Sequence, residues 1–201
     1  IEAITLMLPL LIIADAMNVK RFWKKWDTTL LFSLIPGAIL GIMIANLTMD
    51  HINPEYLRYI IALICIMFAI KNICFKQLHL SFINNRIGAY FMSASSGISS
   101  TLVHAGGPPL IIYFTAIGLA QTKFVATAAV FIAIMNIIKL IGVLSLGLLT
   151  IDMVLIALAF TPVAFMGNWL GVKLNNRLDK KLFLKLMNYL LLLLGLWLIF
   201  S

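Results

Sequence analysis

The sequence predicts an all-α, polytopic membrane protein built from inverted-topology repeats, with a re-entrant hairpin of broken helices. Three observations lead to this fold class. Apolar residues make up 63% of the 201 positions and charged residues only 11%, whereas soluble domains average roughly half apolar and a quarter charged. Apolar runs long enough to span a membrane recur along the chain. One motif occurs twice, followed by an acidic loop in the first copy and by a basic loop in the second. The formal charge of +8 comes from short loops between these runs, which is typical of membrane topology and not of nucleic-acid binding.

Most of the apolar runs have the length of a single membrane-spanning helix. They are residues 3–18, Thr28–Leu47, Tyr56–Phe75, Phe124–Leu148, Met153–Val172 and Leu182–Phe200. A further run, 87–119, is too long for one span and is interrupted by HAGGPP at 104–109. Helices on the two sides of this break would rise roughly 24 Å and roughly 16 Å, which is less than the ~30 Å hydrocarbon core. We therefore expect this run to form a re-entrant hairpin.

The loop charges decide how the broken run crosses, because Lys and Arg favour the cytoplasmic side of a membrane. The loop 48–55 carries Asp50 and Glu55 without Lys or Arg, which is typical of an external loop. If 87–119 crosses an even number of times, every basic loop lies on one side. We therefore expect a multi-pass protein of the cell membrane with these cytoplasmic loops: 18–27, 71–86, 119–123 and 173–181.

An internal repeat gives the domain organisation. IPGAILGIMIA at 35–45 aligns with TPVAFMGNWLG at 161–171 at an offset of 126. The alignment pairs Pro36 with Pro162, Gly41 with Gly167, and Ala45 with Gly171. The loop after the first copy is acidic and the loop after the second is basic, so the two units are expected to have opposite orientations, as in many secondary transporters.

This repeat divides the chain into a first repeat at 1–75, a cytoplasmic linker at 76–86 and a second repeat at 87–201. The second repeat comprises the hairpin and three transmembrane helices, whereas the first comprises three transmembrane helices. Residues 1–18 correspond to 124–142. A first hairpin is therefore expected upstream of Ile1, and it is absent from this chain.

The break in the hairpin is suited to bind an anion. Proline in the first helical turn sacrifices no hydrogen bond, and the free N–H groups and partial positive charge of a helix N-terminus favour a negative ligand. Hydroxyl groups add donors, while His104 is either a ligand or a structural partner. The alternative is that small residues only allow close helix packing, with hydroxyls bonded to their own backbone. The expected hairpin residues are Ser96, Gly97, Ser99, Ser100, Thr101, His104, Gly106, Gly107 and Pro108.

Two ionisable residues, Asp15 and Lys139, lie inside apolar runs and at similar places in the two repeats. Because charge at that depth is costly, such residues suggest function. Lys139 would attract an anion, or Asp15 would neutralise it in a structural pair. Asn136 lies one helical turn from Lys139, so Asn136 and Lys139 join the expected anion-binding residues. Asp15 and Lys139 form the expected coupling or structural ion pair.

These motifs together resemble the sulfite exporter TauE/SafE family of anion transporters. The resemblance is carried by SSGISSTLVHAGGPPLIIYF at 95–114, KFVATAAVFIAIMNIIKL at 123–140, and LPLLIIAD and PGAILG in the first half. It implies transport of a small sulfur-containing or organic anion, such as sulfite or an organosulfonate, by alternating access of the two repeats. The chain departs from the family pattern in lacking the first glycine-rich hairpin, which would contribute half of a central site.

The expected partners are a small anion, the lipid bilayer and a coupling proton or ion, and a homo-oligomer is compatible with the sequence. No enzymatic activity, cofactor, metal or nucleic acid is expected. One alternative is an intramembrane lipid-phosphate hydrolase with a re-entrant serine-rich loop. It would need an arginine or several acids beside the serine, and 88–119 contains no charged residue. A passive anion channel or a non-transporting subunit is the other alternative, although a channel has little use for a buried Asp15–Lys139 pair.

Overall fold

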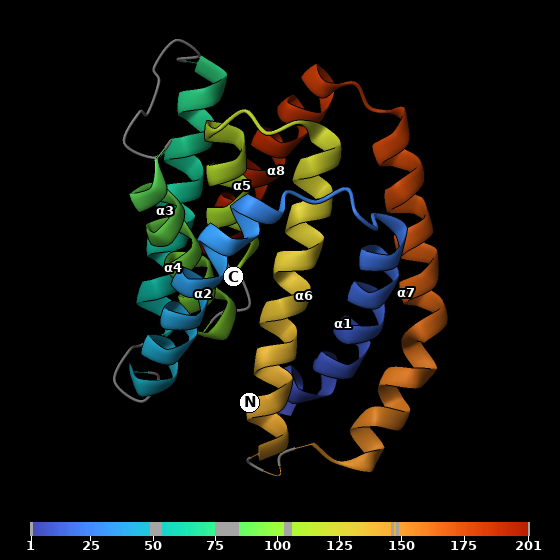
Figure 1. Cartoon of the computed structure of the whole chain (residues 1–201). Coiled ribbons are helices and arrows are strands. Elements are labelled where there is room, and N and C mark those ends of the chain that lie inside the picture. The colour runs from blue at the N-terminus through green and yellow to red at the C-terminus, as the bar shows by residue number, and fades with distance from the viewer. Residues whose placement is uncertain are drawn as a thin grey trace. The chain divides into compact units, whose positions relative to one another are not determined.

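The computed structural model of the chain describes residues 2–48, 54–74, 85–102, 106–145, 147 and 149–200. Within these ranges the only regular secondary structure is α-helix. The helices are α1 Glu2–Arg21, α2 Thr28–Thr48, α3 Pro54–Cys74, α4 Arg86–Leu102, α5 Gly107–Ala116, α6 Gln121–Ser145, α7 Ile151–Arg177 and α8 Lys180–Phe200 (Figure 1). The predicted all-α class is therefore confirmed.

Four helices in the described part of the chain are long and apolar enough to cross a membrane. They are Thr28–Thr48, Gln121–Ser145, Ile151–Asn175 and Lys181–Phe200. The other two predicted spans, 3–18 and Tyr56–Phe75, fall on α1 and α3, except for Phe75, which lies outside the described residues. The chain is a multi-pass membrane protein, as its composition predicts.

The long run 87–119 forms two helices separated by a break, as predicted. Its first helix, α4, has 17 residues, and its second, α5, has 10. At 1.5 Å per residue these lengths are about 25 Å and about 15 Å, so each is shorter than a membrane span. Pro108 and Pro109 occupy the first turn of α5, where a missing N–H leaves no helical hydrogen bond unmade.

The helices group into two compact units, and each unit takes segments from both halves of the sequence. Unit 1 comprises Ile1–Asp27 and Thr122–Leu178, which contain α1, α6 and α7. Unit 2 comprises Thr28–Gln121 and Asp179–Ser201, which contain α2, α3, α4, α5 and α8. The chain therefore passes between the units three times.

In unit 2, the hairpin is attached to α2 by a close approach of the two backbones. A Cβ atom on Gly41 would overlap the Ala94 carbonyl group of α4, and one on Gly97 of α4 would lie 2.5 Å from the Ala38 carbonyl oxygen. Only glycine fits such positions. Small residues at an interface bring membrane helices into extensive van der Waals contact, so this interface fixes the position of α4.

The second interface of unit 2 joins α3 and α8, whose positions are related by the offset of the predicted repeat. Adding 126 to the bounds of α3 gives the bounds of α8. A Cβ atom on Gly195 of α8 would lie 2.9 Å from the carbonyl oxygen of Ala62, and the repeat partner of Gly195 is the buried Ala69. Cys65 and its repeat partner Leu191 are buried in one cluster. The two helices therefore have equal lengths and buried residues at positions that the offset of 126 relates.

In unit 1, helix α7 carries the counterpart of the α2 glycine motif in a different environment. Gly167, the partner of Gly41, and Gly171, the partner of Ala45, are both exposed. A Cβ atom built on either glycine would meet no atom within 4 Å. The two repeats therefore share the motif, but in the described residues only the copy on α2 receives another helix there.

Candidate functional site

A direct hydrogen bond links the two sides of the break between α4 and α5. The Ser96 hydroxyl on α4 donates to the carbonyl oxygen of Gly106, 2.5 Å away, immediately before α5. A Cβ atom on Gly106 would lie 2.7 Å from the Cβ of Ser100, so the chain passes tightly against α4 here. Ser96, Ser100 and Gly106 thus position the start of α5.

Two further hydroxyl groups near the break, those of Ser99 and Thr101, are bonded within α4. Ser99 Oγ donates to the Ser95 carbonyl oxygen at 2.7 Å, and Thr101 Oγ1 donates to the Gly97 carbonyl oxygen at 2.9 Å. Their protons are therefore engaged by the helix backbone, as in the alternative interpretation of these residues. For these hydroxyls to donate to an anion, they must rotate away from the carbonyl groups.

The first turn of α5 offers backbone donors and open space. Pro108 and Pro109 have no N–H group, so the N–H groups at this end of the helix belong to Gly106 and Gly107. The N-cap residue Gly106 has no side chain to bond these N–H groups, and among the described residues a Cβ atom on Gly107 would meet nothing within 4 Å. Gly107 is therefore a position where a ligand can approach the helix N-terminus closely.

A cavity of about 120 Å³ lies beside the break, among α3, α4 and α5. Ser95 and Ser99 of α4 and Pro108 and Pro109 of α5 line it, together with Cys65 and several isoleucines. At about 30 Å³ per water in the liquid, it has room for several waters or one small anion. Its wall combines an apolar surface with two serines. His104, also expected at this site, lies outside the described residues, together with 103 and 105.

Unit 1 contains a second polar cluster, which joins α1 to α6. Asn136 Nδ2 donates to Asp15 Oδ2 at 2.7 Å, and both residues are buried, with 3% and 8% of their surfaces exposed. The ammonium group of Lys139 attracts the Asp15 carboxylate electrostatically. The structure thus brings together Asp15, Asn136 and Lys139, three of the residues singled out in the sequence.

A cavity of about 370 Å³ extends from this cluster along α1. Asp15, Lys20 and Trp23 line it from α1 and the turn that follows, and Ala133 and Ile137 line it from α6. It leads from the buried carboxylate toward the basic end of α1. Sequence reasoning did not predict this cavity, because most of the residues that line it are apolar.

Comparison with models of known families identifies the family of the chain. The model of the sulfite exporter TauE/SafE family matches residues 1–198. The chain belongs to this family. Neither a curated protein nor a solved structure matches the chain. The resemblance inferred from the motifs is thereby confirmed, and members of the TauE/SafE family are membrane transporters of anions rather than enzymes.

The expected anion-binding residues of this TauE/SafE protein divide between the two units. Those of the hairpin, from Ser96 to Pro108, belong to unit 2, whereas Asn136 and Lys139 belong to unit 1. Two polar sites are therefore described separately: the hairpin break in unit 2, and the buried cluster of Asp15, Asn136 and Lys139 in unit 1.

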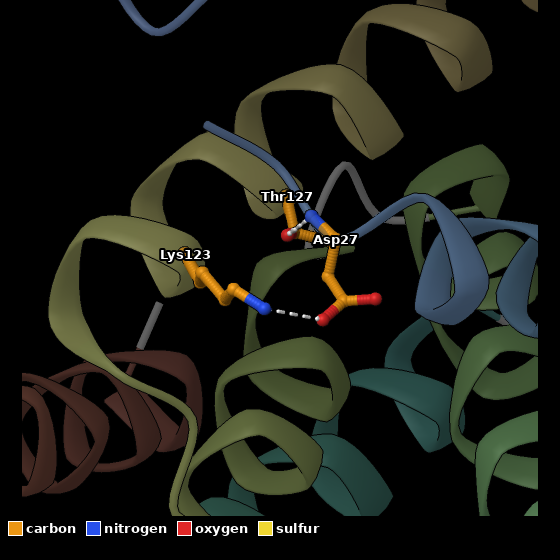
Figure 2. A network of polar contacts seen from close by, with 3 residues as sticks. All are labelled: Asp27, Lys123 and Thr127. Carbon is orange, nitrogen blue, oxygen red and sulfur yellow. Dashed lines mark hydrogen bonds and ion pairs between the residues drawn. The ribbon is translucent and has the colours of Figure 1, made fainter. Parts of the chain in front are cut away.

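A third polar contact in the TauE/SafE protein was not expected from the sequence. Lys123 Nζ lies 3.0 Å from Asp27 Oδ2, and the backbone N–H of Asp27 donates to Thr127 Oγ1 at 3.0 Å (Figure 2). We call Asp27, Lys123 and Thr127, which all belong to unit 1, the Asp27 cluster. The only available signal was that Asp27 is the one acidic residue in the basic loop 18–27.

The Asp27 cluster belongs to unit 1 and lies next, along the chain, to two of the passages between the units. Asp27 is the last residue of unit 1 before α2, and the chain returns to unit 1 at Thr122, next to Lys123. The segment that leaves unit 1 at Asp27 and the segment that returns at Thr122 are therefore held together by these side-chain contacts.

Proposed function

We propose that this TauE/SafE protein moves a small anion across the cell membrane by alternating access. The anion is sulfite, an organosulfonate, or a related sulfur-containing or organic anion. The observation that carries the proposal is the helix break at Gly106, where a short helix begins beside a small cavity with space at Gly107. Non-helical backbone at membrane depth is tolerated where it lines a cavity, and discontinuous helices commonly form transporter sites.

In this proposal, the N–H groups of Gly106 and Gly107 and the positive end of α5 attract the anion. Ser99 and Thr101 turn their hydroxyls from backbone carbonyls to the anion. Each new bond then replaces an existing one, so the net gain is well below the strength of an isolated hydrogen bond. Moderate affinity of this kind suits a carrier, which must release what it binds.

In this proposal, Lys139 and Asn136 attract an anion at the separate buried cluster of unit 1. An ammonium group held among apolar helices is costly unless a negative charge accompanies it. Lys139 would therefore favour entry of an anion, and Asn136 would orient the neighbouring carboxylate of Asp15. These roles correspond to the sequence-based expectation for both residues.

Alternating access requires parts that move as rigid bodies. The close backbone approach at Gly41 and Gly97 favours joint movement of the hairpin with α2, because tightly packed interfaces shift as blocks rather than deform. We propose that the two compact units are the moving parts, and that the Asp27 cluster holds together the two unit 1 segments from which the chain leaves and to which it returns.

The test is anion flux into proteoliposomes that contain the full chain. We expect Gly107→Leu to abolish flux, because its side chain would fill the open space at the start of α5. Gly167→Leu is the matched control, since that glycine also has no atom within 4 Å of a built Cβ but lies on α7, far along the chain from the break. The control should insert and transport normally.

Three other outcomes would contradict the proposal. Flux of sulfite and methanesulfonate that is unchanged in Gly107→Leu would remove the hairpin site. Flux that never exceeds passive equilibration under any ion gradient would indicate a channel. Release of inorganic phosphate from lipid phosphates would support the hydrolase alternative.

A further inference from the structure

We propose that a cavity among α3, α5 and α8 binds the phosphate group of an anionic phospholipid, on the side of the membrane that we predict to be cytoplasmic. Lys181 and Lys185 of α8 hold the phosphate, and the exposed face of α8 takes the acyl chain. The site belongs to unit 2 and shares no lining residue with the cavity at the hairpin break. It does not depend on which anion the protein transports.

The first argument is the cavity itself. Its volume is about 550 Å³, which is ample for a phosphate group with bound water at about 30 Å³ per water. Asn72 of α3, Thr115 of α5, and Lys181, Lys185 and Tyr189 of α8 are among the residues that line it. The wall therefore offers ammonium, amide and hydroxyl groups together with an aromatic ring, as a charged head group on an apolar chain requires.

The second argument is charge. Among the described residues, no carboxylate forms an ion pair with Lys181 or Lys185. The acidic residue nearest to them in sequence is Asp179, whose Oδ1 accepts a hydrogen bond from the N–H of Leu182 at 2.6 Å and so caps the start of α8. The sequence of the loop 75–84 contains neither Asp nor Glu. Even with Asp179 counted, the surroundings of the cavity are therefore net positive.

The third argument is a set of fixed polar groups at the cavity wall. Lys71 Nζ donates to Asn72 Oδ1 at 3.2 Å, and Asn72 Nδ2 donates to Asn188 Oδ1 at 2.9 Å. Asn188 Nδ2 in turn donates to the carbonyl oxygen of Leu184 at 2.9 Å. These bonds join α3 to α8 and bring a third ammonium group, that of Lys71, to this network.

Thr115 adds a hydroxyl group that is not used by the protein. Its Oγ1 atom is buried and has no hydrogen-bond partner in the part of the chain that the structure describes. Buried hydroxyl groups are normally hydrogen-bonded. Because Thr115 lines the cavity, a polar molecule bound there can supply the missing partner.

The fourth argument selects a lipid over a soluble anion. Lys181, Lys185, Tyr189 and Leu193 follow one another at intervals of four residues, so they lie on one face of α8. Both lysines are exposed, as are Tyr189 at 43% and Leu193 at 62%. Charge at the helix start is followed by an aromatic ring and then by an aliphatic side chain. A phospholipid has the same order of groups, from its phosphate to its acyl chain.

The location of the cavity agrees with this ligand. Asn72 lies in the last turn of α3, and Lys181 lies in the first turn of α8, so the cavity is at the ends of these helices and not at their middles. The adjoining loops, 71–86 and 173–181, are two of those that we predict to be cytoplasmic. Basic pockets between membrane helices on that side are suited to phospholipid head groups.

The test measures which lipid stays bound to the full chain. The protein in neutral detergent is mixed with equal amounts of phosphatidylglycerol and phosphatidylcholine, and native mass spectrometry measures the retained lipid. We expect the wild type to retain phosphatidylglycerol in preference. Lys181→Gln/Lys185→Gln should bind it about thirtyfold more weakly, since each lysine near a lipid head group contributes roughly a factor of five. Lys181→Arg/Lys185→Arg should retain it, because both charges remain.

Lys173→Gln/Arg177→Gln is the matched control. It removes two basic residues from the end of α7, on the side that we also predict to be cytoplasmic, but neither residue lines the cavity. The control should bind phosphatidylglycerol as the wild type does. A similar loss in the control, or equal retention of both lipids by the wild type, would overturn the site. Circular dichroism checks folding. If the double variant is unfolded, Lys181→Gln and Lys185→Gln are measured singly, each with an expected loss of about fivefold.

Competition identifies the source of the phosphate group. Inorganic phosphate and methanesulfonate, added at the concentration of the lipid, should not displace phosphatidylglycerol, because neither has an acyl chain to contact the exposed face of α8. Displacement by either one would assign the site to a soluble anion and overturn the lipid assignment. Anion flux is not measured in this experiment, so its outcome is independent of the proposed function.

Discussion

The side-chain amide of Asn136 donates a hydrogen bond to the buried carboxylate of Asp15. Removal of this amide should clearly lower the free energy of unfolding. We expect Asn136→Ala to lower the free energy of unfolding by about 1.5–3 kcal/mol, the usual contribution of a hydrogen bond to a charged group. The matched variant Asn168→Ala removes a neutral amide pair and should cost only about 1 kcal/mol. Thermal unfolding followed by circular dichroism compares the two variants. Equal losses would show that the Asp15 carboxylate does not depend on Asn136.

At the residue scale, the sequence predicted which polar side chains lie near one another better than it predicted their hydrogen bonds. The proximity of Asp15, Asn136 and Lys139 could be predicted, because polar groups inside apolar runs need partners. The bonds of Ser99 and Thr101 could not. A hydroxyl in a helix chooses between a nearby carbonyl and an outside partner, and the sequence does not encode that choice.

At the scale of elements, Gly41 and Gly167 provide a direct comparison of the two repeats. We expect Gly41→Leu to prevent the hairpin from docking on α2, because even a Cβ atom at this position would overlap the Ala94 carbonyl group. Gly167→Leu places the same side chain in open space on α7 and should be tolerated. Limited proteolysis at the hairpin, or the yield of folded protein, measures the difference. Similar behaviour of both variants would contradict the asymmetric packing.

The Asp27 cluster provides a second comparison between elements. Reversal of one charge, in Asp27→Lys or Lys123→Asp, should slow anion transport, and the double reversal should restore part of the rate. The effect on unfolding should stay within about 0.2–1 kcal/mol, because the Lys123 side chain is 54% exposed and exposed ion pairs contribute little. A double-mutant cycle on rate and stability separates the two effects. No recovery in the double variant would exclude the ion pair as the cause.

The elements themselves were largely predictable, and their grouping was not. Hydropathy located the spans, and HAGGPP located the break, because both signals are local in sequence. The repeat predicted halves at 1–75 and 87–201, a division that no observation here tests. The compact units instead interleave the two halves, because grouping depends on which surfaces fit closely, such as α2 against α4.

At the scale of the whole molecule, the loop charges make a prediction about topology. In a Cys65→Ala/Cys74→Ala background, we expect Lys123→Cys to react with an impermeant thiol reagent only from the cytoplasmic side. Asp152→Cys, at the start of α7, should react only from outside. Labelling of both positions from the same side would contradict the predicted crossing of α6, and labelling of Lys123→Cys from outside would contradict the re-entrant hairpin.

The interleaving of the two units also has a consequence for biosynthesis. The hydrogen bond between Asn136 and Asp15 joins residues 121 positions apart, which is roughly 6–24 s of synthesis at about 5–20 residues per second. Helix α1 therefore leaves the ribosome long before its polar partner exists. During that interval an ionised Asp15 has no partner in the bilayer, so α1 must wait at the interface, carry its acid protonated, or be held by the insertion machinery.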